Sequence, residues 1–340
     1  AYDSLPLGGL KVARRSFSEA CFGPEVLAAQ DPPVRLIWVT AGNPGPFTFH
    51  GTNSYVVGRD SVAVIDPGPP DAAHLQALIA AIGGREVSHI LVTHTHMDHS
   101  PLARELARLT GAPLLGEGSH RAARPLHIGE INPLDASGDR DFSPDRALVH
   151  GDVVEGDGFR LEAVFTPGHA AKHMVFAMPE RGLAFSGDHV MGWSTSIVAP
   201  PDGSMADYMA SLDTLLARPE NLYLPGHGGR LPQAPGFVRA LKGHRRMREA
   251  SILARIRAGD RTVGQIVAAI YRDTDPRLHG AAALSVLAHV EDLLASGRIA
   301  SDGPASLDGV HEALAADYPS PATPTSAASR SLRNRSISRA

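Results

Sequence analysis

The sequence contains four potential metal ligands within six consecutive residues, a density that ordinary core packing does not require. Residues 94–99 read His-Thr-His-Met-Asp-His. The preceding run 89–93 is β-branched and apolar, which predicts a strand, and Ser100 followed by Pro101 is typical of a helix start, with Ser100 as the cap. Imidazole and carboxylate are ligands that zinc and related metals select, so this strand-to-helix loop predicts a metal site, with a merely His-rich polar loop as the alternative. The candidate ligands are His94, His96, Asp98 and His99.

Three further candidate ligands each follow a predicted strand. A glycine stands directly before each of them, which allows the chain to bend sharply where the strand ends. Taken singly, each is typical of an ordinary turn with a polar residue. Taken together, they predict that three strand ends converge with the His-rich loop. The three are His169 after the predicted strand 159–165, Asp188 after 183–185, and His227 after 221–224.

The order and spacing of these seven side chains strongly resemble the ligand pattern of the metallo-β-lactamase superfamily of dinuclear metallohydrolases. The resemblance covers residues 35–230 and includes all seven ligand positions. It implies an α/β fold, an αββα sandwich of two mixed sheets with helices outside, and a site at one edge of the sandwich. It also implies that one metal ion is bound by His94, His96 and His169, and a second by Asp98, His99 and His227, with Asp188 bridging the two.

The chemistry expected of this site follows from its donors. Nitrogen and oxygen ligands without sulfur suit two divalent metal ions, with Zn²⁺ favoured and Mn²⁺ or Fe²⁺ as alternatives. Two metal ions about 3.5–4 Å apart can share a water, lower its pKa and polarise the bond that it attacks. We therefore expect a metal-bridging hydroxide to hydrolyse a small ester, thioester, lactone or amide, with Asp98 and Asp188 as the carboxylates of the catalytic centre. Flavodiiron relatives have a carboxylate where His96 stands, which disfavours oxygen reduction, and the complete ligand set argues against a single-iron persulfide dioxygenase.

Other residues near these ligands are candidates for supporting or substrate-binding roles. Asp66, in Ile-Asp-Pro-Gly, matches a structural aspartate of the same family and is expected to orient a ligand, although it could equally form a turn. Segment 187–203 is long for a connection and, with residues 51–55, is similar to the β-lactamase-like protein 2 group, so we expect it to flank the substrate pocket. Candidates for substrate contact or proton transfer, with packing as the alternative for each, are Trp193, Ser194, Thr195, His173 and His189.

The C-terminal part predicts a small helical module. The first of its three helices, 237–258, is basic, the second begins at a Thr262-x-x-Gln265 capping box, and the third carries an apolar stripe. With a short wing after them, these helices are similar to the winged-helix domain appended in the β-lactamase-like protein 2 group. The predicted domains are a lead-in at 1–34, a catalytic domain at 35–236, the winged-helix-like domain at 237–303 and a disordered tail at 304–340.

Charge divides the chain into an acidic and a basic part. Residues 1–229 carry 16 Lys and Arg against 26 Asp and Glu, whereas residues 230–340 carry 16 against 10. The acidic part repels phosphates, which favours a small-molecule substrate, but Arg245, Arg246 and Arg248 of the basic helix could bind nucleic acid. The alternative function is therefore a single-stranded endoribonuclease. Packing or a homodimer contact is the other role open to the module.

Composition indicates the cellular setting. The chain has 340 residues, enough for one large and one smaller domain, and Cys21 is its single cysteine, so an intramolecular disulfide cannot form. We find no run of ~18 apolar residues of the kind that spans a membrane. Residues 1–17 lack the apolar core of a secretion signal. We therefore expect a cytoplasmic protein with no membrane partner.

Overall fold

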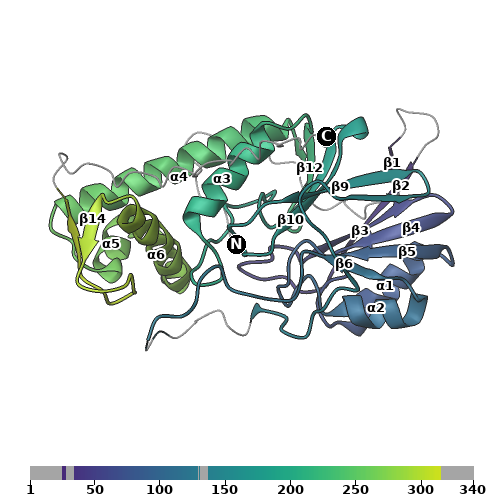
Figure 1. Ribbon diagram of the computed structural model, residues 1–340, viewed down its shortest axis with the longest axis horizontal. Coiled ribbons are helices and arrows are strands. Elements are labelled where there is room, and N and C mark those ends of the chain that lie inside the picture. Colours follow the sequence, from purple (N-terminus) through teal and green to yellow (C-terminus); the bar gives the residue numbers. More distant parts are fainter. Residues whose placement is uncertain (1–24, 28–33, 129, 131–136, 315–340) are drawn as a thin grey trace, which may run out of the picture.

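The computed structural model describes residues 25–27, 34–128, 130 and 137–314, and two facing β-sheets form its centre (Figure 1). The first sheet consists of β1 (Glu25–Leu27), β2 (Val34–Thr40), β3 (Asn53–Gly58), β4 (Ser61–Ile65), β5 (Glu86–Leu91), β6 (Leu114–Gly116) and β7 (Arg146–Ala147), in that spatial order. Neighbours are antiparallel from β1 to β4 and parallel from β4 to β7.

The second sheet has six strands and is mostly antiparallel. Its strands are β8 (Val153–Gly156), β9 (Phe159–Phe165), β10 (Met174–Met178), β11 (Leu183–Gly187), β12 (Leu222–Pro225) and β13 (Leu231–Pro232), in that spatial order, with a 3₁₀ turn η3 (Pro179–Arg181) between β10 and β11. Only β11 and β12 run parallel among these neighbours. The hairpin of β8 and β9 turns at Asp157 and Gly158, an Asp-Gly pair that is typical of a two-residue turn.

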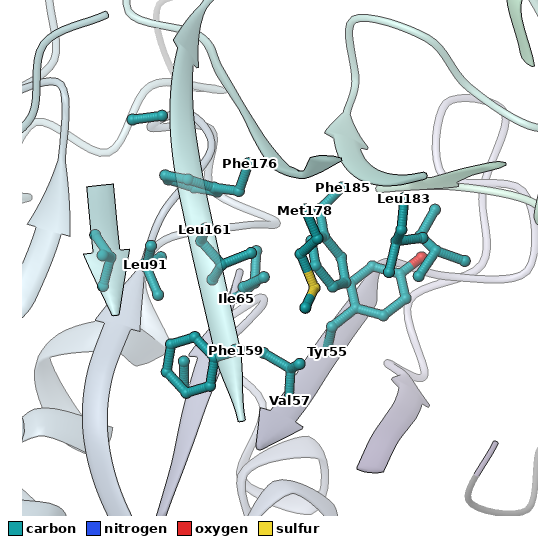
Figure 2. Close-up of a cluster of buried hydrophobic side chains, with 14 of the residues drawn as sticks. Tyr55, Val57, Ile65, Leu91, Phe159, Leu161, Phe176, Met178, Leu183 and Phe185 are labelled. Carbon is teal, nitrogen blue, oxygen red and sulfur yellow. The ribbon is translucent and has the colours of Figure 1, made fainter. Parts of the chain in front are cut away.

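Apolar side chains from both sheets fill the space between them (Figure 2). In β9, Phe159 and Leu161 are buried and Arg160 between them is exposed, the alternation of a strand with one face on a core. The rings of Tyr55 from the first sheet and Phe185 from the second lie 5.1 Å apart. This packing fixes the two sheets against each other and therefore fixes the relative positions of the loops at their ends.

Helices cover the outer face of each sheet and complete the αββα sandwich that the sequence predicts. Apolar residues of α1 (Ala72–Ile82) and α2 (Leu102–Thr110) pack on the first sheet. Those of α3 (Met205–Leu216) and α4 (Ala234–Arg257) pack on the second. In Figure 1, α1 and α2 lie beyond β5 and β6, and α4 runs along the opposite side of the molecule.

The long helix α4 continues past the sandwich into a winged-helix module (Figure 1). The predicted capping box is present at the start of the second helix of this module. There the Thr262 hydroxyl accepts from the backbone of Gln265, and the Gln265 side chain accepts from the backbone of Thr262. Apolar side chains of these helices and of the end of α4 form a separate core. The module elements are α5 (Val263–Ile270), the 3₁₀ turn η4 (Pro276–Leu278), α6 (His279–Ala295), and the antiparallel wing strands β14 (Ile299–Ser301) and β15 (His311–Ala313).

The structure corrects the predicted limits of the module and of the lead-in. Strand β15 lies in the segment predicted to be a disordered tail from residue 304, because the wing returns to pair with β14. Helix α4 begins at Ala234, so the predicted boundary after residue 236 falls inside a helix. Strand β1 of the predicted lead-in pairs with β2. Residues 1–24 and the rest of the predicted tail, 315–340, lie outside the described residues.

The start of α2 also differs from the sequence prediction. Ser100 does not cap this helix, whose N-cap is Pro101, without a side-chain hydrogen bond. The Ser100 hydroxyl instead donates to Asp139 Oδ2 at 2.6 Å. Asp139 belongs to the segment 116–148, for which no element was assigned from the sequence. This hydrogen bond ties that segment to the end of the His-rich loop.

One helical segment meets the length and composition of a membrane span, contrary to the expectation from the sequence. Within Pro276–Ala295, a window of 18 residues has a mean hydropathy of 1.2, and 39% of that window is buried inside the protein. Val286, Leu287, Val290 and Leu293 lie in the core of the winged-helix module. Packing against α4 and α5 therefore accounts for the apolar face of α6.

The core between the sheets generates a test of stability. Leu161 is fully buried, and Leu161→Ala should lower the free energy of unfolding by about 3 kcal/mol because it leaves a cavity. The same truncation at Leu109, which is 48% exposed on α2, should cost much less. Urea unfolding followed by far-UV circular dichroism measures both. Equal losses in the two variants would contradict the described core.

Candidate metal centre

The seven candidate ligands converge at one edge of the sandwich, although they come from four separate strand ends. The loop 94–99 follows β5, and His169 follows β9. Asp188 and His227 follow the parallel neighbours β11 and β12. Their nitrogen and oxygen atoms form three overlapping sets of three, in each of which all ligand atoms lie within 4.8 Å of one another. The side chains that were singled out for their types and spacing are thus brought together.

The first group consists of His94, His96 and His169. The Nδ1 atom of His96 lies 3.0 Å from His94 Nε2 and 3.1 Å from His169 Nε2. The rings of His94 and His169 meet edge to face, with centroids 5.0 Å apart. Three ring nitrogens therefore point at one small volume.

The second group consists of Asp98, His99 and His227. The Oδ2 atom of Asp98 lies 3.1 Å from His227 Nε2 and 3.4 Å from His99 Nε2. The two histidine Nε2 atoms are themselves 3.4 Å apart. This group has a carboxylate where the first group has a third imidazole.

Asp188 lies between the two groups. Its Oδ2 atom is 3.2 Å from Nε2 of His227 in the second group and 3.8 Å from Nε2 of His169 in the first. Its Oδ1 atom is 3.4 Å from His99 Nε2 and is buried without a hydrogen-bond partner among the described residues. One carboxylate thus faces members of both groups.

Each of the five histidines uses its other ring nitrogen for a hydrogen bond. Such outer partners fix the ring orientation and leave the lone pair of the inner nitrogen directed at the centre. The outer partners are Thr93 Oγ1 at 3.0 Å for His94, Asp202 Oδ2 at 2.7 Å for His96, Asp66 Oδ2 at 3.0 Å for His99, the Ile197 carbonyl at 2.6 Å for His169, and the Gly51 carbonyl at 3.2 Å for His227.

Asp66 supports the His-rich loop through several contacts at once. Its carboxylate accepts from the Thr93 backbone N–H and hydroxyl, both at 2.7 Å, and from the ring of His99. Because the Thr93 hydroxyl also contacts His94, one buried aspartate orients a histidine of each group. Asp66 has a φ of 49°, a left-handed conformation that a non-glycine residue rarely adopts. The structure thus places Asp66 where the sequence predicts it.

Two supporting residues were missed from the sequence. Asp202, which hydrogen-bonds to His96, lies in the sequence Pro-Pro-Asp-Gly. Aspartate is common in such turns, so this sequence gives no sign of a role at the site. Thr52 donates from its hydroxyl to Asp98 Oδ2 at 3.0 Å. Its segment was singled out only for its family resemblance. Both contacts join residues far apart in the chain, so no local pattern indicates them.

The glycines before the strand-end ligands serve two different purposes. Gly187 has a φ of 48°, a left-handed bend that brings Asp188 into the site. Gly226 has no such conformation, but a Cβ atom there would lie 2.3 Å from Asp188 Oδ1. At this position glycine is therefore required for space, whereas the sequence suggested a sharp backbone bend.

The charges of the second group raise the proton affinity of its histidines. Burial lowers the pKa of His227, but Asp188 and Asp98 more than offset this effect and raise it to about 9. The same carboxylates overcome burial at His99 and raise its pKa well above the usual value. Burial would raise the pKa of both carboxyl groups, but the two histidines hold them well below their usual range. Without a metal ion, protons supply the positive charge that the carboxylates attract.

The histidines of the first group do not all behave alike. Burial, reinforced by His96, lowers the pKa of His169 to about 4. Burial, with the neighbouring His99, lowers the pKa of His94 well below its usual value. At His96, burial also lowers the pKa, but the hydrogen bond and charge of Asp202 reverse the shift. The neutral imidazoles direct lone pairs at the centre, beside two ionised carboxylates. These donors are suited to bind a divalent cation and gain little from contact with one another.

His173 and His189 do not face this centre as substrate contacts would. His173 is fully buried, with its Nδ1 atom 2.9 Å from the Thr166 hydroxyl and its Nε2 atom accepting from the Asp188 backbone at 3.2 Å. It therefore braces the backbone of Asp188. His189 is fully buried against the ring of Tyr208, 4.5 Å away, and burial lowers its pKa to about 3. Both residues take the packing alternative.

The predicted substrate candidate Trp193 lies on a loop whose backbone contacts the second group. Its ring stacks on that of Phe49, with centroids 4.9 Å apart and an angle of 11° between the planes. The backbone beside it is bound to a ligand residue, since Gly192 N–H donates to the His227 carbonyl at 2.9 Å. Ser194 and Thr195 follow on the same segment and are half-buried.

Comparison with known families identifies both parts of the chain. A model of the metallo-beta-lactamase superfamily matches residues 47–227, which contain every candidate ligand. A model of the beta-lactamase associated winged helix domain matches residues 262–306. The two matches correspond to the sandwich and to the module at the end of α4.

Curated relatives agree with these matches. Lactamase-like protein adaB of Aspergillus niger is 31% identical over 234 residues, which cover 68% of this chain and 66% of that protein. Atrochrysone carboxyl ACP thioesterase AgnL7 of Paecilomyces divaricatus is 32% identical over 207 residues, covering 60% and 59%. Beta-lactamase-like protein 2 homolog of Drosophila melanogaster is 28% identical over 284 residues, covering 78% and 89%. The chain thus spans less than two thirds of the length of these two fungal relatives.

Among solved structures, a metallo-beta-lactamase family protein from Thermus thermophilus has the same fold. The two superpose with a TM-score of 0.66 over 82% of this chain and 98% of that one, at 23% sequence identity. At this level of identity the likeness shows that the two proteins share a fold.

The raised pKa values of His99 and His227 generate a prediction about pH. A metal ion that binds the second group near pH 7 must displace about two protons, so its apparent affinity should fall as pH falls, roughly tenfold per pH unit for each proton. Above a pH of about 9, His227 is already neutral. It should then release no proton when the metal ion binds. Calorimetric titration in buffers of different ionisation enthalpy measures the release. A binding heat that does not depend on the buffer would contradict it.

The space requirement at Gly226 generates a second prediction. Gly226→Ala should lower metal affinity by tenfold or more, on the order expected when a ligand is displaced, because the new Cβ atom collides with Asp188 Oδ1. Gly236→Ala is the matched control, since a Cβ atom on α4 at that position meets nothing within 4 Å. Competition with a chromogenic chelator measures both affinities. Unchanged affinity in Gly226→Ala would show that Asp188 is not part of the centre.

Proposed function

Because the chain belongs to the metallo-β-lactamase superfamily, we propose that it is a dinuclear, zinc-dependent hydrolase of small thioesters and esters. The observation that carries the proposal is the division of the ligand atoms into a nitrogen-only first group and a carboxylate-containing second group, with Asp188 facing both. The seven candidate ligands are histidines and aspartates, and nitrogen and oxygen donors favour zinc or a similar borderline ion over copper(I) or an iron–sulfur cluster. Lactones and amides are further bonds that the same centre could cleave.

Asp98 and Asp188 would have different roles in the hydrolysis. When bound, the metal ions would polarise the scissile carbonyl and lower the pKa of a water to near neutrality. Asp98 has the most exposed side chain of the seven candidate ligands, at 26%, and the Thr52 hydroxyl fixes its Oδ2 atom. Its exposure and its fixed oxygen support a role for this carboxylate in orienting the attacking water. Asp188, with a side chain only 9% exposed, would hold the two groups together from inside.

Apolar side chains close to the ligands favour a substrate with an apolar acyl group. The stacked rings of Phe49 and Trp193 lie on loops that contact His227 of the second group. Phe47, two residues before Phe49, is 50% exposed, and Met97, within the loop 94–99, is 39% exposed. Exposed apolar side chains next to a polar centre suit a substrate with an apolar part and a reactive carbonyl. A relative that is 32% identical is named as a thioesterase of an acyl carrier protein substrate, which supports this class.

The basic face of α4 is less available for nucleic acid than the sequence suggests. Arg245 is only 4% exposed, so it cannot serve as the phosphate contact considered from the sequence. The guanidinium of Arg248 lies 4.3 Å from the ring centroid of Tyr271. Arg246 is exposed and remains the candidate for such a contact. These placements favour a small-molecule substrate over single-stranded RNA.

A substrate panel tests the proposed class. The zinc-loaded full-length protein is assayed against an acyl thioester, an aryl ester, a lactone, a β-lactam and single-stranded RNA, with kcat/KM compared for each. We expect the thioester and the ester to be the best substrates. RNA cleavage with no ester or thioester turnover would overturn the proposal and support the nuclease alternative.

The proposed role of Asp98 generates a mutational prediction. Asp98→Ala should lower kcat/KM for the best substrate by at least about a thousandfold, since both a metal ligand and the water-orienting carboxylate are lost. The far-UV spectrum should not change, because Asp98 lies in a loop and outside the core. Asp273→Ala is the control, because that side chain is 98% exposed. Turnover close to that of the unmodified protein in Asp98→Ala would refute the mechanism.

A further inference from the structure

One segment, residues 192–203, separates the first group from the C-terminal helices. On its inner side it supplies the outer hydrogen-bond partners of two ligands in that group. The Ile197 carbonyl accepts from His169 Nδ1 at 2.6 Å, and the Asp202 carboxylate accepts from His96 Nε2 at 2.7 Å. A shift of this segment would therefore turn two rings of the first group.

On its outer side, the segment is held by a buried arginine of α4. Arg245 donates from its guanidinium to the carbonyl of Ser196, the residue before Ile197. The guanidinium lies 5.3 Å from the ring centroid of Tyr208, and within the described part of the chain no carboxylate pairs with it. A buried guanidinium without a carboxylate partner depends on its remaining hydrogen bonds, and a hydrogen bond from a charged donor is stronger than one between neutral groups. The bond to the Ser196 carbonyl therefore anchors this segment.

A second anchor comes from α6 of the winged-helix module. Glu291 accepts from Nε and Nη2 of Arg124, at 2.9 and 2.6 Å, and Glu130 accepts from the other side of the same guanidinium. The backbone N–H groups of Ala123 and Arg124 both donate to the Pro201 carbonyl, at 2.8 and 3.3 Å. Pro201 directly precedes Asp202. The module is thus connected to His96 through Arg124.

Among the described residues, the side chains of the second group have no hydrogen-bond partner in this segment, although Gly192 N–H donates to the backbone carbonyl of His227. The outer partners of its members are the Thr52 hydroxyl for Asp98, the Asp66 carboxylate for His99 and the Gly51 carbonyl for His227. All three belong to the first sheet or to the loops at its strand ends. Beyond the support that both groups share through Asp66, the first group takes two outer partners from the segment 192–203, whereas the side-chain partners of the second group lie elsewhere.

From this asymmetry we infer that Arg245 and Glu291 are positioning residues, through which the C-terminal helices set metal affinity at the first group and not at the second. The inference rests on the proposed two-metal centre. It gives the winged-helix module a role in assembling the catalytic site, distinct from binding a nucleic acid.

Site-resolved zinc titration tests this inference. The metal-free full-length protein is titrated with Zn²⁺ in competition with a chromogenic chelator. Asp202→Ala, which removes the direct partner of His96, and Asp98→Ala identify the binding steps of the first and second groups. Arg245→Met and Glu291→Ala should weaken the Asp202-sensitive step about three- to tenfold, less than the loss of a direct partner, and leave the other step unchanged. Arg245→Lys and Glu291→Gln, which retain a donor and an acceptor, should restore part of the affinity.

The matched control is Glu249→Ala. Glu249 on α4 pairs with Arg298 inside the winged-helix module, and among the described residues neither side chain hydrogen-bonds to the segment 192–203 or to Arg124. It should leave both steps unchanged. An effect of Glu291→Ala equal to that of Glu249→Ala, or equal weakening of both steps, would overturn the inference.

Binding of one zinc ion by the unmodified protein would refute the two-metal proposal. The inference would then stand only if both Asp202→Ala and Glu291→Ala lower the affinity for that ion.

Discussion

The structure depends on holding seven candidate metal ligands close together. At these distances their lone pairs and carboxylates repel or leave one another unsatisfied unless positive charge lies between them. Inward atoms of neighbouring ligands lie 3.0 to 3.8 Å apart, and most of these side chains are buried. Such crowding of lone pairs and carboxylates costs free energy unless protons or a metal ion supply positive charge. The core that the two sheets share offsets this cost, because it fixes the strand ends from which the ligands project.

The orientation of these ligands comes from hydrogen bonds on their outer atoms. Asp66 orients one histidine in each group and is itself held in an unfavourable backbone conformation. Strain of this kind persists only where the surrounding structure over-determines it, and it is common at functional sites. The remaining supports differ between the groups, since those of the second group come from the first sheet and those of the first group include a segment anchored by α4 and α6. Hydrogen bonds therefore link α4 and α6 to the segment that supports the first group.

Much of this arrangement could be predicted from the sequence because its signals are local. The His-rich loop, the strand-end ligands and the Thr262 capping box each occupy a few neighbouring residues, and the family resemblance supplied the sandwich. The supports could not be predicted, because Asp202 and His96 are 106 residues apart in the chain and meet only through the fold. Likewise, Arg245 belongs to a run of basic residues that predicts an exposed face, whereas helix packing turns this one side chain inward. The wing strand β15 was missed because three residues carry too little periodicity to be recognised.

The central claim, that the two groups form one centre for two metal ions, is tested most directly by anomalous diffraction at the zinc absorption edge. Crystals of the zinc-loaded full-length protein should show two anomalous peaks, one within bonding distance of the first group and one within bonding distance of the second. Asp188 should contact both ions. A single peak, or a second peak outside the seven ligands, would contradict the account.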